Sequence, residues 1–200
     1  MNLDVKVKLN EPLKLEPIIK RTAQHYGRML ETFRPFAKGG ELNERNLTTQ
    51  FLIEIKNSHP NAIICQEFHI PEYSSKKDSA FVDAVVITND TVLFIEAKRN
   101  AAIMSNFDAI NLDIKKLNSA ALKKQFKAVC DVREFGLPQS AYGVVLADAW
   151  KKSLTDKWLT EYVNDSEVAL KPNFQKIASF PDYSEDYDLL YGVFKLDLSD

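Results

Sequence analysis

Apolar residues recur at helical spacing in two stretches of the first sixty residues. The first pattern begins at Pro17, which suits the opening turn of a helix, and continues to Arg34-Pro35. Its apolar positions are Ile18, Ile19, Ala23, Tyr26, Met29, Leu30 and Phe33. The second pattern begins near Asn43, a favourable N-cap, and ends at His59-Pro60-Asn61. Two amphipathic helices are therefore predicted, with a break at Gly39-Gly40 between them.

The next part of the chain has short apolar runs that are typical of β-strands. Strands are predicted over Ala62–Ile70, Ser79–Thr88 and Thr91–Lys98. The segment Ser74–Asp78 is predicted to be a loop. Asn89-Asp90 is predicted to form a tight turn, because both residue types tolerate positive φ.

The second half of the chain continues the alternation of helices and strands. A helical region from about Phe107 to Phe135 is predicted, with an interruption near Asn118-Ser119. It is followed by a strand at Tyr142–Ala147, apolar on both faces and therefore buried. A helix around Leu154–Val163 and a strand around Tyr191–Leu198 complete the prediction. Two hundred residues without internal repeats suit one α/β domain spanning residues 1–200.

The distribution of charge changes this picture more than the net charge does. A net charge of −2 argues against a general polyanion-coating protein. Lys and Arg exceed Asp and Glu by four in Met1–Gly40 and by five in Lys98–Arg133, whereas the acids are in excess by six in Ser153–Asp200. A local basic surface can still bind nucleic acid, because salt screens each charge beyond about 8–10 Å. Ordinary solvated faces explain the same distribution equally well.

The sequence also bears on location and on redox state. No apolar run reaches membrane-spanning length, and the N-terminus lacks the apolar core of a secretory signal. A cytoplasmic location and no membrane partner are therefore expected. Cys65 and Cys130 lie among apolar neighbours, which favours two reduced and buried thiols.

The second and third predicted strands form a hairpin whose register can be worked out. If Asn89-Asp90 is a two-residue turn, then Thr88 pairs with Thr91 and the ladder continues away from the turn. Strict alternation then places Asp83 directly opposite Glu96, with both side chains on one face of the sheet.

This opposed pair of acids is the strongest chemical signal in the sequence. Two facing carboxylates repel each other among apolar neighbours unless a cation or a proton joins them. Mg²⁺ suits such a pair, because it takes a few carboxylate oxygens, keeps several waters and reaches a substrate phosphate. Lys98 lies two residues beyond Glu96 on the same face, where it would stand beside the ion. The alternative is that Asp83 and Glu96 reach solvent from strand ends, since an acid followed two residues later by Lys is common.

Asp83, followed after twelve residues by Glu96-Ala97-Lys98 on a hairpin, resembles the PD-(D/E)xK nuclease superfamily. That superfamily has a helix-strand-strand-strand-helix-strand core, similar to the order predicted here over about residues 41–147. Val82 stands where the name has proline, which is often missing in the superfamily. The resemblance implies a restriction-endonuclease-like mixed sheet flanked by helices, with an extra N-terminal helix and a C-terminal helix-strand extension.

The resemblance also implies roles for residues outside the hairpin. The superfamily commonly has an acid on the first core helix, which Glu44 matches, with Glu41 as the substitute. Some members have a Gln on the helix after the third strand, and Gln125 is the candidate. Val129 replaces the Tyr that follows this Gln in exonuclease-type members. Glu44 also suits the first turn of a helix through the macrodipole, and Gln125 suits an ordinary polar helix position.

The resemblance implies a metal-dependent nuclease that hydrolyses phosphodiester bonds of DNA. Mg²⁺ or Mn²⁺ would be held by Asp83, Glu96, the Ala97 carbonyl and Glu44, while Lys98 would assist the attacking water. Phosphate contacts are predicted for Lys123, Lys124 and Lys127, although a solvated helix face explains each lysine singly, as it does Lys115 and Lys116.

Three interpretations of the function therefore stay open on sequence grounds. The first is the nuclease, which as a member of this superfamily could be a homodimer, since many relatives dimerise to cut two strands. The second is a binding or assembly module that keeps the fold but has lost the chemistry. The third is an unrelated α/β protein in which Asp83, Glu96 and Lys98 are a coincidence.

Overall fold

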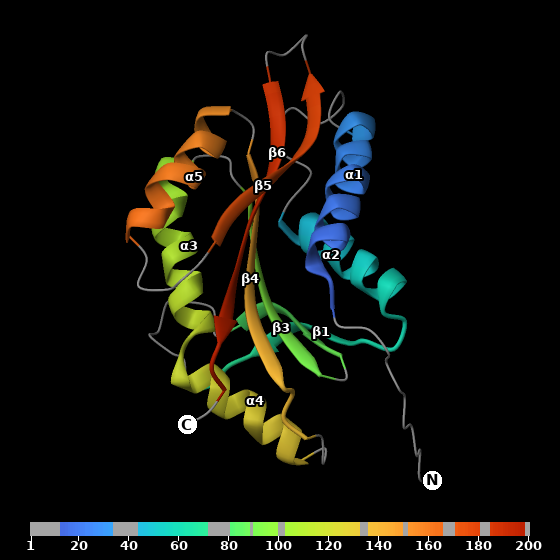
Figure 1. The fold of residues 1–200 in the computed structure, drawn as a ribbon, viewed down its shortest axis with the longest axis vertical. Coiled ribbons are helices and arrows are strands. Elements are labelled where there is room, and N and C mark those ends of the chain that lie inside the picture. The colour runs from blue at the N-terminus through green and yellow to red at the C-terminus, as the bar shows by residue number, and fades with distance from the viewer. Residues whose placement is uncertain are drawn as a thin grey trace.

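A six-stranded mixed sheet runs through the molecule and is covered by helices (Figure 1). The computed structural model describes residues 13–33, 44–71, 81–88, 90–99, 103–132, 136–149, 152–165, 171–180 and 185–198. The strand order is β1-β2-β3-β4-β6-β5, with β3 parallel to β4 and the other neighbouring pairs antiparallel. The predicted α/β class with a mixed sheet is therefore confirmed.

The elements follow one another in nearly the predicted order. Helices α1 (Leu15–Phe33) and α2 (Glu44–Ser58) precede the strands β1 (Ile63–His69), β2 (Phe81–Ile87) and β3 (Thr91–Arg99). Helices α3 (Ile103–Leu117) and α4 (Ala120–Val132) lead to β4 (Ser140–Ala149). The described chain ends with α5 (Lys152–Asp165), β5 (Lys171–Phe180) and β6 (Glu185–Leu196). The predicted interruption at Asn118-Ser119 separates α3 from α4.

The C-terminal extension differs from the prediction, because it contains two strands and not one. The missed strand, β5, lies at an edge of the sheet and pairs with β6. Its side chains are largely exposed or half-buried where they are described, so the apolar alternation that identifies a strand is weak. Pro172 is tolerated there because an edge strand has one side without ladder hydrogen bonds.

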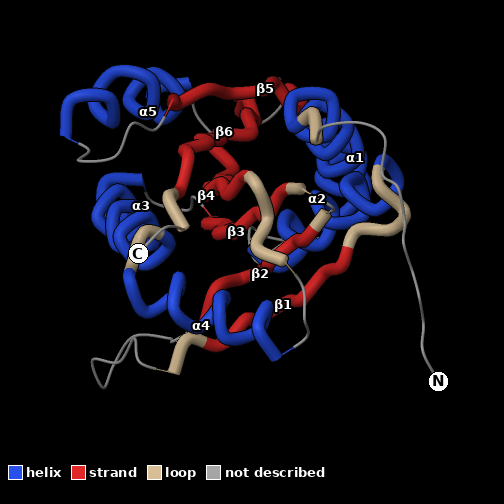
Figure 2. Tube along the Cα trace, turned by 60° about the horizontal axis from the view of Figure 1, so that its bottom comes forward, coloured by secondary structure: helices blue, strands red, loops and turns tan. Residues whose placement is uncertain are grey.

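The helices form two layers that bury the two faces of the sheet. Helices α1 and α2 cover one face, while α3, α4 and α5 cover the other (Figure 2). Most of the α1 stripe predicted from the sequence is buried, namely Ile18, Ile19, Ala23, Tyr26 and Leu30, whereas Met29 is half-buried and Phe33, at the end of the helix, is exposed. Strand β4 is apolar on both faces and buried from Gly143 onwards, as expected for a strand in the middle of the sheet.

Several smaller predictions have different outcomes. Cys130 is buried as predicted, but Cys65 is exposed because β1 is an edge strand and not a central one. Among the described helices, none is long and apolar enough to cross a membrane. The predicted loop at Ser74–Asp78, the break at Gly39-Gly40 and the N-cap Asn43 lie outside the described residues.

Candidate active site

The β2–β3 hairpin has the predicted register. Thr88 N donates to the Thr91 carbonyl at 2.8 Å, the contact expected on either side of the predicted turn, although Asn89 itself lies outside the described residues. The paired ladder continues from the turn to Ala84 and Ile95. The predicted register is therefore confirmed as far as this pair, and Asp83 and Glu96 are the next residues along the two strands, just beyond the paired ladder. Beyond the ladder, Ala97 N donates to the Asp83 side chain at Oδ2, 2.7 Å away.

The β1–β2 ladder is irregular at the level of Asp83. Glu67, which lies across from Asp83, has a φ of 53°, in the left-handed region that non-glycine residues rarely occupy. This pair is missing from the ladder, although the residues on both sides of it are paired. Ala84 packs under α1 and α2, whereas Val82 packs on the opposite face, which regular alternation would not allow. Asp83 therefore lies where β2 turns from one face to the other.

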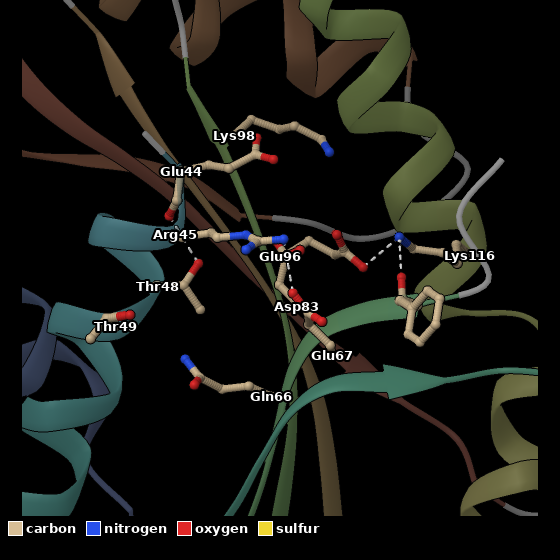
Figure 3. A pocket seen from close by; sticks show the side chains of 11 residues that line it. Glu44, Arg45, Thr48, Thr49, Gln66, Glu67, Asp83, Glu96, Lys98 and Lys116 are labelled. Carbon is tan, nitrogen blue, oxygen red and sulfur yellow. Dashed lines mark hydrogen bonds and ion pairs between the residues drawn. The ribbon is translucent and has the colours of Figure 1, made fainter. Parts of the chain in front are cut away.

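A pocket of about 650 Å³ opens at this irregularity. Helix α2, the three strands of the β1–β3 meander and helix α3 all contribute to its wall (Figure 3). The lining residues are Glu44, Arg45, Thr48, Thr49, Gln66, Glu67, Phe81, Asp83, Glu96, Lys98 and Lys116. The two acids and the lysine of the sequence motif thus share one pocket with the predicted helix acid, Glu44.

Four charged side chains of alternating sign are linked beside this pocket, and three of them, Glu96, Lys98 and Lys116, line it. Lys116 Nζ lies 2.6 Å from Glu96 Oε1 and 3.3 Å from Asp113 Oδ1, while Lys98 Nζ lies 3.0 Å from Asp113 Oδ2. Lys116 Nζ also donates to the Phe81 carbonyl at 2.8 Å. Glu96 Oε1 and Asp113 Oδ2 are buried and accept no well-directed hydrogen bond within the described structure, so the ammonium groups reach them only as ion pairs.

These contacts shift the protonation equilibria of the pocket. Burial raises the pKa of Glu96 to about 8, with further contributions from the negative charges of Asp113 and Asp83. Burial also raises the pKa of Asp83, although its hydrogen bond from Ala97 N opposes the shift. Burial lowers the pKa of Lys98, but the contact with Asp113 and the negative charges of Glu96 and Glu44 together outweigh it, and the net shift of the pKa is upward. Burial thus makes both acids of the hairpin harder to ionise, in spite of the two lysines beside them.

The shifted Glu96 predicts how the stability of the metal-free protein depends on pH. The pKa of an unperturbed glutamate is 4.5, whereas that of Glu96 in the folded protein is about 8. Between these two pH values the folded state therefore keeps a proton on Glu96 that the unfolded state has released. The contribution of this proton to the free energy of unfolding is complete below about pH 4.5 and is lost as the pH rises towards 8. Thermal melts in EDTA should therefore show a fall in stability over this range that is reduced in Glu96→Gln. A pH dependence identical in the two proteins would contradict this assignment.

The structure does not bring every predicted residue to the pocket. Gln125, Lys123, Lys124 and Lys127 lie on α4 and are not part of the lining. Lys127 instead lines a separate pocket of about 810 Å³ near the start of β4, whereas Lys98 lies beside the other end of that strand. Glu41, the substitute for Glu44, lies outside the described residues.

Sequence reasoning missed the contribution of α3. Lys116 was interpreted as a solvated helix residue, but it is buried against Glu96. Asp113 was not singled out, although Ile110, Asp113, Ile114 and Leu117 have the spacing of a buried helical stripe. An acid inside an apolar stripe was the signal that could have identified it.

Comparison of the chain with protein-family models, with curated protein sequences and with solved structures finds no match. The function is therefore inferred from the residues of the pocket and their geometry.

Proposed function

We propose that this protein is a metal-dependent nuclease of the PD-(D/E)xK type that hydrolyses phosphodiester bonds of DNA. The supporting observation is that Asp83, Glu96 and Lys98 line one pocket together with Glu44 from the helix before the strands. The order α2-β1-β2-β3-α3-α4-β4 also resembles the core of that superfamily, with its single helix divided into α3 and α4. The restriction-endonuclease-like architecture is part of the same proposal.

The chemistry of the donor atoms fits a divalent cation. Glu96 Oε1 is a buried carboxylate oxygen whose close contact is the Lys116 ammonium group 2.6 Å away, and burial is the main reason that the pKa values of Asp83 and Glu96 are raised. Among the described residues, no three His, Cys, Asp or Glu side chains are grouped as around a metal ion. Mg²⁺ does not require three, because it is commonly held by one or two carboxylates and keeps several waters.

Each residue has a specific role in this proposal. Asp83, Glu96 and the Ala97 carbonyl would hold Mg²⁺ or Mn²⁺, and Glu44 would support the ion directly or through water. A bound Mg²⁺ lowers the pKa of a coordinated water and stabilises charge on the phosphoryl oxygens. Lys98, held by Asp113 at 3.0 Å, is placed to orient the attacking water or to neutralise charge that develops on the phosphate.

A cleavage assay tests this function directly. The purified protein is incubated with single-stranded, duplex and branched DNA and with matched RNA substrates, in Mg²⁺, in Mn²⁺ and in EDTA. Cleavage of at least one DNA substrate is expected with the metals and none with EDTA. An absence of cleavage on the whole panel would contradict the nuclease proposal. Cleavage confined to RNA would show that the substrate is RNA and not DNA.

A binding or assembly module without catalysis is the second candidate, and the Lys116–Glu96 ion pair favours it. In such a protein the 2.6 Å contact would persist, and the ammonium group would permanently replace the metal. Calorimetry with Mn²⁺ separates the two candidates, because only the nuclease should bind the ion.

Nucleic-acid binding should weaken with salt, because phosphate contacts release counterions. Lys123, Lys124 and Lys127 remain the predicted phosphate contacts, and replacing all three by Ala should lower affinity across sequences. The slope of log affinity against log salt should flatten by about one unit for each phosphate that is no longer neutralised. An unchanged slope would indicate that nucleic acid binds at another surface, either at the basic N-terminal helix or at the exposed Arg45 in the pocket wall.

A further inference from the structure

Lys116 occupies an unusual position for a helix lysine. Its side chain is only 9% exposed, and its ammonium group lies 2.6 Å from an oxygen of Glu96, which is 1% exposed. Both groups carry a desolvation cost that neither would carry at the surface. A buried carboxylate that is proposed to hold a metal thus already has a cation beside it.

The surroundings of Lys116 provide partners that do not depend on Glu96. An ammonium group has three N–H donors, and two further acceptors lie within reach. These are the Phe81 carbonyl at 2.8 Å and Asp113 Oδ1 at 3.3 Å. Lys116 can therefore release Glu96 and remain charged, buried and paired on the same wall of the pocket.

We propose that Lys116 is a built-in counter-ion that holds Glu96 in the metal-free protein and competes with the divalent ion for this carboxylate. The inference rests on the proposed nuclease function, because it concerns the same metal site. When Glu96 turns to the metal, Lys116 stays with Phe81 and Asp113. Lys116 thereby sets the affinity of the site for divalent metal, as a positioning residue and not as a ligand.

Two effects make this competition unfavourable for metal binding. The divalent ion must displace the Lys116 ammonium group from the buried Glu96 carboxylate. It must then lie close to that ammonium group, which is also positively charged. Both effects disappear when Lys116 is replaced by a neutral side chain and the pH is high enough for Glu96 to be ionised. A variant with a neutral side chain of similar length at position 116 should therefore bind divalent metal more tightly than the wild type.

The test is calorimetric titration of Mn²⁺ into the 200-residue protein and its variants at a pH above 8, where little proton remains on Glu96 to compete with the metal. Lys116→Met should increase the affinity about tenfold or more, the order expected when a like charge is removed at a few ångströms. Lys116→Arg keeps the charge and should stay close to the wild type. Lys115→Met removes the neighbouring charge, which is exposed on the same helix, and should have little effect. Circular dichroism establishes that each variant is folded.

Asp113→Asn keeps the inference testable if Lys116→Met does not fold. Without the Asp113 charge, Lys116 depends more on Glu96, so the affinity for Mn²⁺ should fall. Unchanged affinity in this variant, or in a folded Lys116→Met, overturns the inference, as does an equal gain in Lys115→Met.

The failure of this inference can be distinguished from the failure of the proposed function. A wild type that binds Mn²⁺ and cleaves DNA, with the same affinity in Lys116→Met, overturns only the role of Lys116. Binding that is measurable only in Lys116→Met supports that role. If neither protein binds Mn²⁺, both proposals fail.

Discussion

Replacement of Asp83 by Asn is expected to abolish divalent-metal binding and DNA cleavage while the chain remains folded. Asp83 provides one of the two strand carboxylates of the pocket, and the neutral amide cannot replace its charge towards a metal. The amide oxygen can still accept the 2.7 Å hydrogen bond from Ala97 N, so the strand geometry should survive. Burial raises the pKa of Asp83, which means that its ionised form destabilises the metal-free protein at neutral pH. The variant should therefore be at least as stable as the wild type in EDTA.

Calorimetry with Mn²⁺, thermal melts and the cleavage assay together check this expectation. Asp156→Asn is a matched control, because Asp156 is an exposed carboxylate on α5 and should change none of the three measurements. Unchanged Mn²⁺ affinity in Asp83→Asn would refute the assignment of the metal site.

Replacement of Lys98 by Ala should abolish turnover and leave metal binding intact. Lys98 is not a proposed ligand, and its ammonium group is paired with Asp113 at 3.0 Å on the pocket wall. Its side chain is 25% exposed, so it remains accessible to water and substrate from the pocket. Since a lysine in this place acts on the water or on the developing charge, the loss should fall on kcat, by about a hundredfold to a thousandfold.

The comparison is made under single-turnover conditions, alongside calorimetry with Mn²⁺. Lys115→Ala removes an exposed lysine from α3 and should keep full activity. Full activity in Lys98→Ala would exclude the catalytic role. Loss of metal binding in that variant would instead indicate that Lys98 organises the carboxylates through Asp113.

The central hairpin could be predicted because the information that specifies it is local. Alternation of side chains and a two-residue turn determine the register, and Asp83 and Glu96 follow from counting outward. Helices α1 and α2 were predicted for the same reason, since their apolar stripes repeat within a few turns. Strand β5 has a weak pattern because an edge strand buries little, and it was missed.

The sequence by itself thus determined the α/β class, the hairpin register and the presence of Asp83, Glu96 and Lys98 in one pocket. Only the tertiary structure decided which other charges join them. Lys115 and Lys116 are adjacent and chemically identical, yet the rotation of α3 against the sheet buries only Lys116, beside Glu96. The left-handed Glu67 also depends on packing, because no local preference of a glutamate favours that conformation. Contacts between elements far apart in the chain carry no periodic signature, so the wall of the pocket becomes visible only when the sheet and its helices are assembled.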